Sequence, residues 1–216
     1  GPEKYHKLIP NFQVLRLDIG MNTTFLKNGR MVLGILFVLG CCACSDESYI
    51  IGEGIKENRD KWFIQGHIGS TWKDEQYYRT REMEYVRPAF EDLLKRLQTD
   101  YIDLGMIHYV DSEEEWDDLQ QSEYMDYVME LKRTGVIRHI GMSSHNPKVA
   151  KKAAESGYVE MILFSINPAF DMLPASENID TMFAEEFDSS LKGIDADRAR
   201  LYKACEENDV GITVMK

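Results

Sequence analysis

Residues 101–109 read Y-I-D-L-G-M-I-H-Y, and this stretch decides the fold. It holds a short apolar run of the length of one buried strand, between two segments with the periodicity of amphipathic helices. His108 stands at the carboxyl end of the run. In parallel α/β sheets, that end of a strand is where ligands bind. The stretch therefore predicts a buried parallel strand that presents a candidate functional histidine.

Strand-like and helix-like segments alternate along the chain on both sides of this stretch. Further strands are expected at 62–68, 136–143, 159–167 and 210–215, and helices at 45–58, 80–98, 112–133, 146–157 and 195–208. Such alternation predicts a parallel sheet with helical crossovers. The near-uniform size of the units favours a (β/α)8 TIM barrel over a doubly wound sheet, as does the absence of a G-x-G-x-x-G sequence.

Two local features are also expected from the pattern. In the helix at 45–58, Tyr49, Ile50 and Ile55 should face the core. Residues 69–78 should form a polar loop whose aromatic side chains, Trp72, Tyr77 and Tyr78, pack on the rim of the barrel or, alternatively, form a wall beside the substrate.

The composition is that of a globular protein, since 44% of the 216 residues are apolar. The length predicts a single barrel domain over 1–216. The net charge of −12 argues against nucleic acids and anionic membrane surfaces as partners, because both bind through basic patches. A phosphate-bearing cofactor stays compatible with this charge, since backbone N–H groups and one or two cations suffice to hold it.

The four cysteines indicate the compartment. Three of them lie within 41–44 and cannot all pair with Cys205, so a reducing, cytoplasmic location is expected rather than a disulfide framework. No apolar run reaches the roughly 18 residues of a membrane-spanning helix. The longest run, at 31–44, contains V-L-G-C and resembles a lipoprotein processing site, but a buried strand is the simpler interpretation.

Two motifs resemble the aldo-keto reductase superfamily. They read L-L-K-R-L-Q-T-D-Y-I-D-L-G-M-I-H-Y at 93–109 and L-K-R-T-G-V-I-R-H-I-G-M-S-S-H at 131–145. In addition, W-F-I-Q-G-H-I-G-S at 62–70 and F-S-I-N-P-A-F-D at 164–171 are similar to a bacterial subgroup. The order and spacing of the motifs match those of the superfamily.

The resemblance covers 45–216 and is poor over 1–44. It implies a (β/α)8 barrel that is incomplete, because the superfamily's last strand and its helices have no counterpart in this sequence. The open edges of such a barrel predict self-association. The implied activity is reduction of an aldehyde or ketone by NADPH, in which a tyrosine, assisted by a lysine, an aspartate and a histidine, protonates the carbonyl oxygen.

The resemblance carries the catalytic residues over unevenly. His108 matches the superfamily's histidine. The lysine is expected at 66 or 67, where the residues are Gly66 and His67, so His67 becomes a candidate for polarising the carbonyl. The aspartate and the tyrosine are expected within 39–44, which reads L-G-C-C-A-C. Three of the four catalytic positions are thus replaced, which predicts weak or absent turnover.

The nicotinamide side of the site matches better. Ser143 and Ser144 correspond to the S-N pair that holds the carboxamide in the superfamily. Ser165 or Asn167 would supply the contact from the next strand. The resemblance therefore implies four candidate NADPH-binding residues, and no metal ligand.

Two other functions stay open. The first is a non-catalytic barrel fragment or binding subunit, as the replaced catalytic positions suggest. The second is a metal-dependent hydrolase, in which His67, His108 and His145 converge from neighbouring strand ends and Asp111 or Asn167 completes the site.

Overall fold

The computed structural model describes residues 25–27, 30–31, 35–38, 47–74, 76–166, 170–178, 180 and 193–215. The cysteine-rich segment 39–44, on which two catalytic positions were expected to fall, lies outside these residues.

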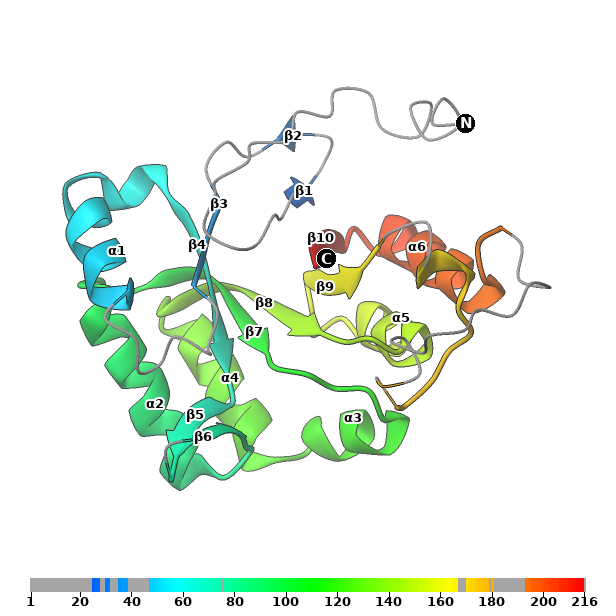
Figure 1. Cartoon of the computed structure of the whole chain (residues 1–216), viewed down its shortest axis with the longest axis horizontal. Helices are drawn as coiled ribbons and strands as arrows, with labels where there is room; N and C mark the ends of the chain where they lie inside the picture. Colours follow the sequence, from blue (N-terminus) through cyan, green and yellow to red (C-terminus); the bar gives the residue numbers. More distant parts are fainter. Residues whose placement is uncertain are drawn as a thin grey trace.

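Strands and helices alternate through the chain, as the sequence predicts (Figure 1). The strands are β1 (Phe25–Lys27), β2 (Arg30–Met31), β3 (Ile35–Val38), β4 (Phe63–Ile68), β5 (Ser70–Lys73), β6 (Gln76–Arg79), β7 (Ile102–Ile107), β8 (Ile137–Ser143), β9 (Met161–Ser165) and β10 (Gly211–Met215). The helices are α1 (Glu47–Ile55), α2 (Met83–Arg96), α3 (Glu113–Leu119), α4 (Glu123–Arg133), α5 (Pro147–Glu155) and α6 (Ala196–Glu207), with short 3-10 turns η3 (Lys56–Lys61) and η4 (Phe170–Met172).

The main sheet has the strand order β2-β1-β10-β9-β8-β7-β4-β3. Neighbouring strands from β3 to β10 are parallel, and they follow one another in chain order, as in a barrel of βα units. Strand β1 pairs antiparallel with both β10 and β2. This main sheet is open and curved, and β5 and β6 form a separate two-stranded sheet, which confirms the predicted α/β fold of an incomplete (β/α)8 barrel.

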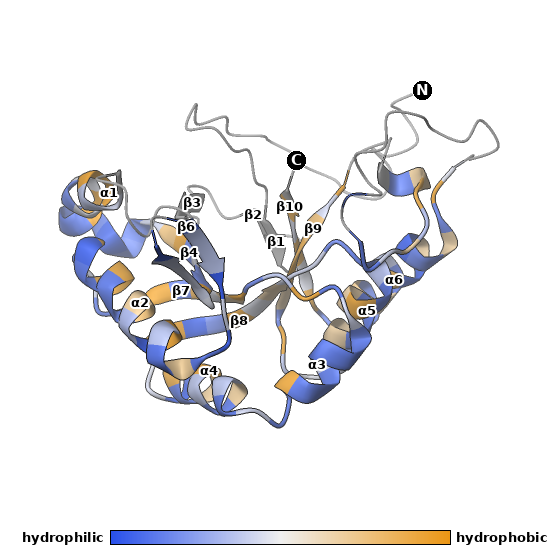
Figure 2. Cartoon of the chain, turned by 60° about the horizontal axis from the view of Figure 1, so that its bottom comes forward, coloured by the Kyte–Doolittle hydropathy of each residue, from blue (hydrophilic) through white to orange (hydrophobic). Residues whose placement is uncertain are grey.

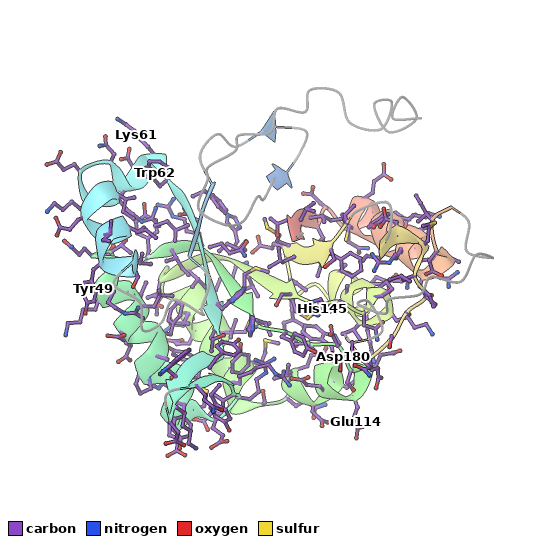
Figure 3. The ribbon with its side chains drawn as sticks, viewed as in Figure 1. Tyr49, Lys61, Trp62, Glu114, His145 and Asp180 are labelled. Atoms are coloured by element: carbon purple, nitrogen blue, oxygen red, sulfur yellow. The ribbon has the colours of Figure 1, made fainter. Side chains whose placement is uncertain are left out.

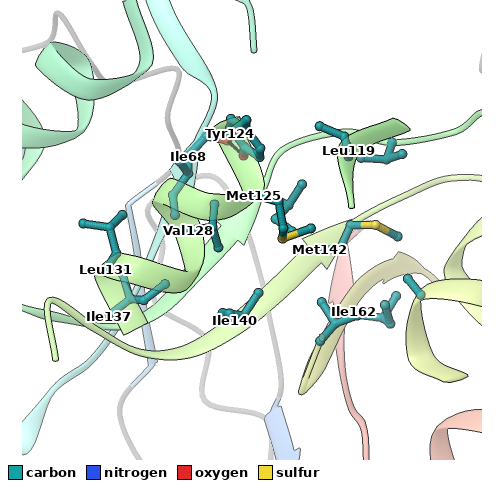
Figure 4. Close-up of a cluster of buried hydrophobic side chains, with 14 of the residues drawn as sticks. Ile68, Leu119, Tyr124, Met125, Val128, Leu131, Ile137, Ile140, Met142 and Ile162 are labelled. Atoms are coloured by element: carbon teal, nitrogen blue, oxygen red, sulfur yellow. Dashed lines mark hydrogen bonds between the residues drawn. The ribbon is translucent and has the colours of Figure 1, made fainter. Parts of the chain in front are cut away.

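The helices line the outer side of this curved sheet (Figure 2). Helix α4 packs over β8, where its Met125, Val128 and Leu131 join Ile137 and Ile140 in the main apolar core (Figure 4). The opposite face of the sheet carries a second apolar cluster of Leu104, Met106, Met161 and Leu163. No helix in the described part of the chain is long and apolar enough to span a membrane.

A buried carboxylate ties the amino ends of three strands together. Asp103 of β7 accepts hydrogen bonds from Arg59 Nη2 at 2.8 Å, from Ile64 N at 3.0 Å and from Arg138 Nη1 at 3.0 Å. Two arginines therefore compensate the burial of one acid. This group lies at the end of the sheet opposite His108, so it supports the site without taking part in it.

The prediction of a single helix at 112–133 is wrong, because the segment contains two helices. Helix α3 ends at Leu119, and the hydroxyl of Ser122 accepts a hydrogen bond from Met125 N at 3.3 Å. Ser122 therefore caps a new helix, α4.

The expected inner face of α1 is only partly correct. Ile55 is buried, but Tyr49 and Ile50 are 49% and 69% exposed, and Tyr49 lies at the outer edge of the molecule (Figure 3). The reason is a close approach at Gly52, where a Cβ atom would lie 2.4 Å from the carbonyl oxygen of Arg96. This contact turns Gly52 toward α2 and the two apolar side chains toward solvent.

The loop expected at 69–78 is a two-stranded hairpin, β5–β6, in which Ser70 pairs with Arg79 and Trp72 with Tyr77. Gly69 makes the turn out of β4 with a φ of +98°, which favours glycine. A Cβ atom there would lie 2.6 Å from Arg81 Nη1. The hairpin is therefore held against the carboxyl end of β4.

Candidate active site

The two candidate catalytic histidines lie side by side at the carboxyl ends of adjacent strands. His67, near the end of β4, is opposite Met106 in the parallel register with β7. His108 follows the last residue of β7, and its backbone N–H donates to Ile68 O at 3.2 Å. The centroids of the two imidazole rings are 4.1 Å apart, and the ring planes are tilted by 39°.

Burial keeps both imidazoles neutral. His67 is 6% exposed, and burial lowers its pKa to about 4. Burial also lowers the pKa of His108 well below its usual range, and the neighbouring His67, Arg81 and Arg79 lower it further. A neutral imidazole offers one N–H donor and one acceptor nitrogen, which suits a neutral, polarisable ligand group such as a carbonyl.

Two arginines fix the backbone that carries His108. Arg81 Nη2 donates to the carbonyl oxygens of His108 at 2.6 Å and Tyr109 at 3.1 Å. Arg79 Nη1 donates to Tyr109 O at 2.7 Å, and the carboxylate of Glu115 accepts hydrogen bonds from both guanidinium groups. Tyr109 has a φ of +55°, a strained conformation that these bonds help to hold.

The hairpin brings a phenol to this group that sequence reasoning missed. Tyr77 Oη forms a hydrogen bond with His108 Nε2 and lies 3.1 Å from Ser70 Oγ. The Tyr77 ring meets the His108 ring edge-on, at an angle of 86°. The available signal was the position of an aromatic segment directly after the strand that carries His67.

Two of the candidate cofactor-binding serines lie at the same edge of the sheet. Ser143 ends β8, is buried, and its hydroxyl accepts the Tyr109 N–H at 2.7 Å. Ser165 ends β9, is also buried, and its carbonyl oxygen accepts a hydrogen bond from Arg198 Nη1 at 2.9 Å. His67, His108, Ser143 and Ser165 therefore line the carboxyl ends of four consecutive strands of the sheet.

Ser144 is engaged elsewhere. Its hydroxyl donates to Asp111 Oδ1 at 2.9 Å, and the same carboxylate accepts the His145 backbone N–H at 2.6 Å and pairs with His145 Nδ1 at 2.9 Å. Burial acts to raise the pKa of Asp111, but the hydrogen bonds from His145 and Ser144 outweigh it and the pKa is lowered. Asp111 thus remains an anion that organises the turn after β8.

The three-histidine metal site is not formed. Within the described ranges, no group of three or more His, Cys, Asp or Glu side chains is placed to hold a metal ion. His145 is bound to Asp111, whereas the rings of His67 and His108 pack against each other. Asn167, the remaining candidate residue, lies outside the described residues.

Comparison with known proteins gives consistent matches. The model of the aldo/keto reductase family matches residues 43–216. Among curated proteins, the uncharacterized oxidoreductase YqkF of Bacillus subtilis (strain 168) is 32% identical over 127 residues, which are 58% of this chain and 40% of YqkF.

Solved structures show a similar fold. The holo form of aldo-keto reductase AKR11C1 from Bacillus halodurans has a TM-score of 0.53 and 27% identity, over 62% of this chain and 44% of that one. An aldo/keto reductase from Klebsiella pneumoniae, solved in complex with NADP and acetate, has a TM-score of 0.52 and 16% identity, over 82% and 50% of the two chains.

The chain spans half or less of the length of each of these relatives. The family model nevertheless covers most of the chain, and the parallel strands carry the site in the order that a barrel requires. The chain belongs to the aldo/keto reductase family.

Proposed function

We propose that this chain binds NADPH at the carboxyl edge of its sheet and reduces an aldehyde or ketone beside His108. The observation that carries the proposal is the adjacent pair of neutral imidazoles, His67 and His108, on the edge that also presents Ser143 and Ser165. The relative from Klebsiella pneumoniae, solved with NADP, supports this choice of cofactor.

The residues at this edge fit a nicotinamide carboxamide. Ser143 accepts the N–H of Tyr109. A hydroxyl that accepts one hydrogen bond still has its own hydrogen to donate, and a carboxamide oxygen would accept it. Ser165 would supply the neighbouring contact. When bound, NADPH would supply the hydride that reduces the carbonyl carbon.

The histidines would hold the carbonyl in place. The neutral imidazole of His67 would bind the carbonyl oxygen by a hydrogen bond, and His108, whose Nε2 is bonded to Tyr77, would border the same oxygen. The two adjacent rings would also exclude water from one side of the carbonyl, which would strengthen that hydrogen bond. The resemblance implies a lysine at 66 or 67, where the chain has Gly66 and His67, so the developing alkoxide would lack an ammonium group and turnover would be slow.

The test is a titration of the chain with NADPH, followed by quenching of its three tryptophans. Saturable binding is expected, and Ser143→Ala should weaken it by roughly 2- to 12-fold, the worth of one hydrogen bond. Ser156→Ala is the matched control, since Ser156 lies at the C-terminal end of α5, away from the strand ends, and should leave binding unchanged. A folded chain that shows no saturable binding would contradict the proposal.

Turnover is measured next as the loss of NADPH absorbance with a panel of aldehydes and ketones. The parent chain should oxidise NADPH only when a carbonyl compound is present. His108→Gln should bind NADPH as the parent does but lower kcat, because the amide cannot reproduce the imidazole contacts.

A second candidate is a non-catalytic barrel that binds ligand or partner without turnover. The open sheet, which ends at β2 and β3 in the described part of the chain, favours it, as does the absence of a lysine at 66 and 67, where the resemblance implies one. Binding of NADPH without any oxidation would support this candidate. Light scattering that shows a defined dimer would add that the open edges pair in solution.

A further inference from the structure

We propose that Tyr77, carried by the β5–β6 hairpin, donates the proton to the substrate oxygen, and that His108 and Ser70 position its phenol. The inference rests on the proposed function. It assigns the proton donor to a hairpin that no motif of the sequence had connected with catalysis.

The phenol is already bonded to the histidine at the centre of the site. Tyr77 Oη forms a hydrogen bond with His108 Nε2, and Ser70 Oγ lies 3.1 Å from the same oxygen. Ser70 begins β5 and is buried, so it is a fixed neighbour. The three groups therefore form a short chain of hydrogen bonds that ends at the edge of the sheet.

The hairpin cannot slide away from this contact easily. Thr80 N donates to Gly69 O at 3.0 Å and closes its base. Arg79, the last residue of β6, and Arg81, which follows it closely, bind the carbonyl oxygens of His108 and Tyr109. The phenol and the imidazole are thus held together through their main chains as well as through their side chains.

Exposure suits the role of a proton donor. Tyr77 is 38% exposed although its oxygen reaches the histidine, so the ring stands between solvent and site. The exposed side allows a carbonyl compound to approach the phenol and allows a proton to return from water. The partner residues Ser70 and His67 are buried, which fixes the inner side of the site.

The step balances in atoms and electrons. Bound NADPH would supply the hydride that forms the new C–H bond, and the electron pair of the C=O π bond would move to oxygen. The Tyr77 O–H bond breaks and its proton forms the O–H bond of the alcohol. The phenolate is stabilised by hydrogen bonds from His108 Nε2 and Ser70 and then takes a proton from water.

The neighbouring tyrosine provides a matched control. Tyr78 lies on the same strand, but its Oη donates to Glu82 Oε1 at 3.0 Å and its ring packs edge-on against Tyr85. It makes no described contact with either site histidine. Loss of its hydroxyl changes the hairpin by the same single atom without touching His108.

The decisive experiment compares Tyr77→Phe with Tyr78→Phe in NADPH binding and in carbonyl reduction. Tyr77→Phe should lower kcat at least 100-fold, as expected for loss of a general acid, with the Kd for NADPH within about twofold of the parent value. The solvent deuterium isotope effect on kcat should also disappear. Tyr78→Phe should stay within about twofold of the parent in both measurements.

The outcomes separate this inference from the proposed function. A parent chain that oxidises NADPH, with Tyr77→Phe keeping its kcat, overturns the assignment of Tyr77 alone. A parent chain that oxidises no NADPH with any carbonyl compound overturns the proposed reduction and this inference with it.

A second measurement needs no activity. In protein labelled with 13C at the tyrosine Cζ atoms, the resonance missing from Tyr77→Phe identifies Tyr77. This resonance should shift on His108→Gln, because its hydrogen-bond partner changes, whereas the Tyr78 resonance should not. An unmoved Tyr77 resonance would show that the two side chains are not bonded in solution, and the inference would fall.

Discussion

His108 and His145 both stand just beyond the ends of neighbouring strands, yet their surroundings are opposite. His108 contacts His67 and Tyr77 and lies near two guanidinium groups, and burial is the main cause of its low pKa. His145 lies against the carboxylate of Asp111, which binds both its ring and its backbone. The same residue type is thus a neutral hydrogen-bonding group in one half of the site and the partner of an anion in the other.

The difference teaches that local charge, rather than position on the sheet, sets the role of each histidine. The β4–β7 half holds neutral groups that can meet a carbonyl. The β8 half uses its carboxylate to organise the turn that follows the strand. We therefore expect changes in the first half to affect turnover and changes in the second half to affect mainly stability.

The largest effect on stability should come from removing the carboxylate. Asp111→Ala leaves the backbone N–H and the ring Nδ1 of His145 without their acceptor and removes one bond of the Ser144 hydroxyl, and should lower the free energy of unfolding by about 3 kcal/mol. Urea denaturation measures the change. Asp118→Ala, an exposed position on α3, is the control and should cost less than about 0.5 kcal/mol. Equal losses in the two variants would mean that the Asp111 bonds are not formed.

A titration of stability should separate the two halves by pH. The folded pKa of His67 is about 4 against an ordinary value of 6.5, so the unfolded chain binds more protons between these values. The stability that neutral His67 contributes is present above 6.5 and is lost as the pH falls toward 4. We expect a loss of roughly 2 kcal/mol between pH 7 and about 4.5.

The carboxylate behaves differently in the same titration. The pKa of Asp111 is lowered from 3.8, so its contribution is present above that value and is lost only as the pH falls further, through the lowered folded pKa. The His67 prediction is measured by urea denaturation of the parent and of His67→Gln at pH 7 and at about pH 4.5. The variant should lose less stability on acidification than the parent does, and an unchanged loss would contradict the burial of a neutral imidazole at this position.

The smallest effect concerns the turn that aims the hairpin. Gly69→Ala and Gly135→Ala both place an alanine at positive φ, and this backbone strain by itself should cost about 1 kcal/mol in each case. A Cβ at Gly69 also meets Arg81 and Thr80 O, whereas a Cβ at Gly135 meets no atom within 4 Å. Gly69→Ala should therefore lower kcat as well, by displacing the hairpin, while Gly135→Ala keeps the parent kcat. Equal kcat values in the two variants would dissociate the hairpin from turnover.

Much of the fold could be predicted because its signals are local. The apolar spacing of 80–98 and the run at 101–109 correspond to α2 and β7, and Asn146 with Pro147 begins α5 as expected. Where prediction failed, a contact between distant residues decides the structure. Tyr49 and Ile50 are exposed because Gly52 meets α2, some 40 residues away in the sequence.

The residues of the site also divide into those that local signals predict and those that a distant contact decides. His67 and His108 could be placed next to each other because both end buried strands, and parallel strands present their ends at one edge. The position of Tyr77 beside His108 could not be predicted, because the β5–β6 hairpin has no alternating apolar pattern and lies largely on the surface. Its contact with His108 joins residues 31 apart in the sequence and depends on the turn at Gly69.

The parallel strands follow one another in space in the order of the chain, from β3 to β10. Each βα unit thus contacts mainly its immediate neighbours, as the modules of a repeat protein do. Loss of structure should then begin at the outer strands and move inward. Amide hydrogen exchange should be slowest in the central strands β7 and β8, each of which pairs with a parallel strand on both edges. The chemistry at His108 consequently belongs to the part of the chain that opens last.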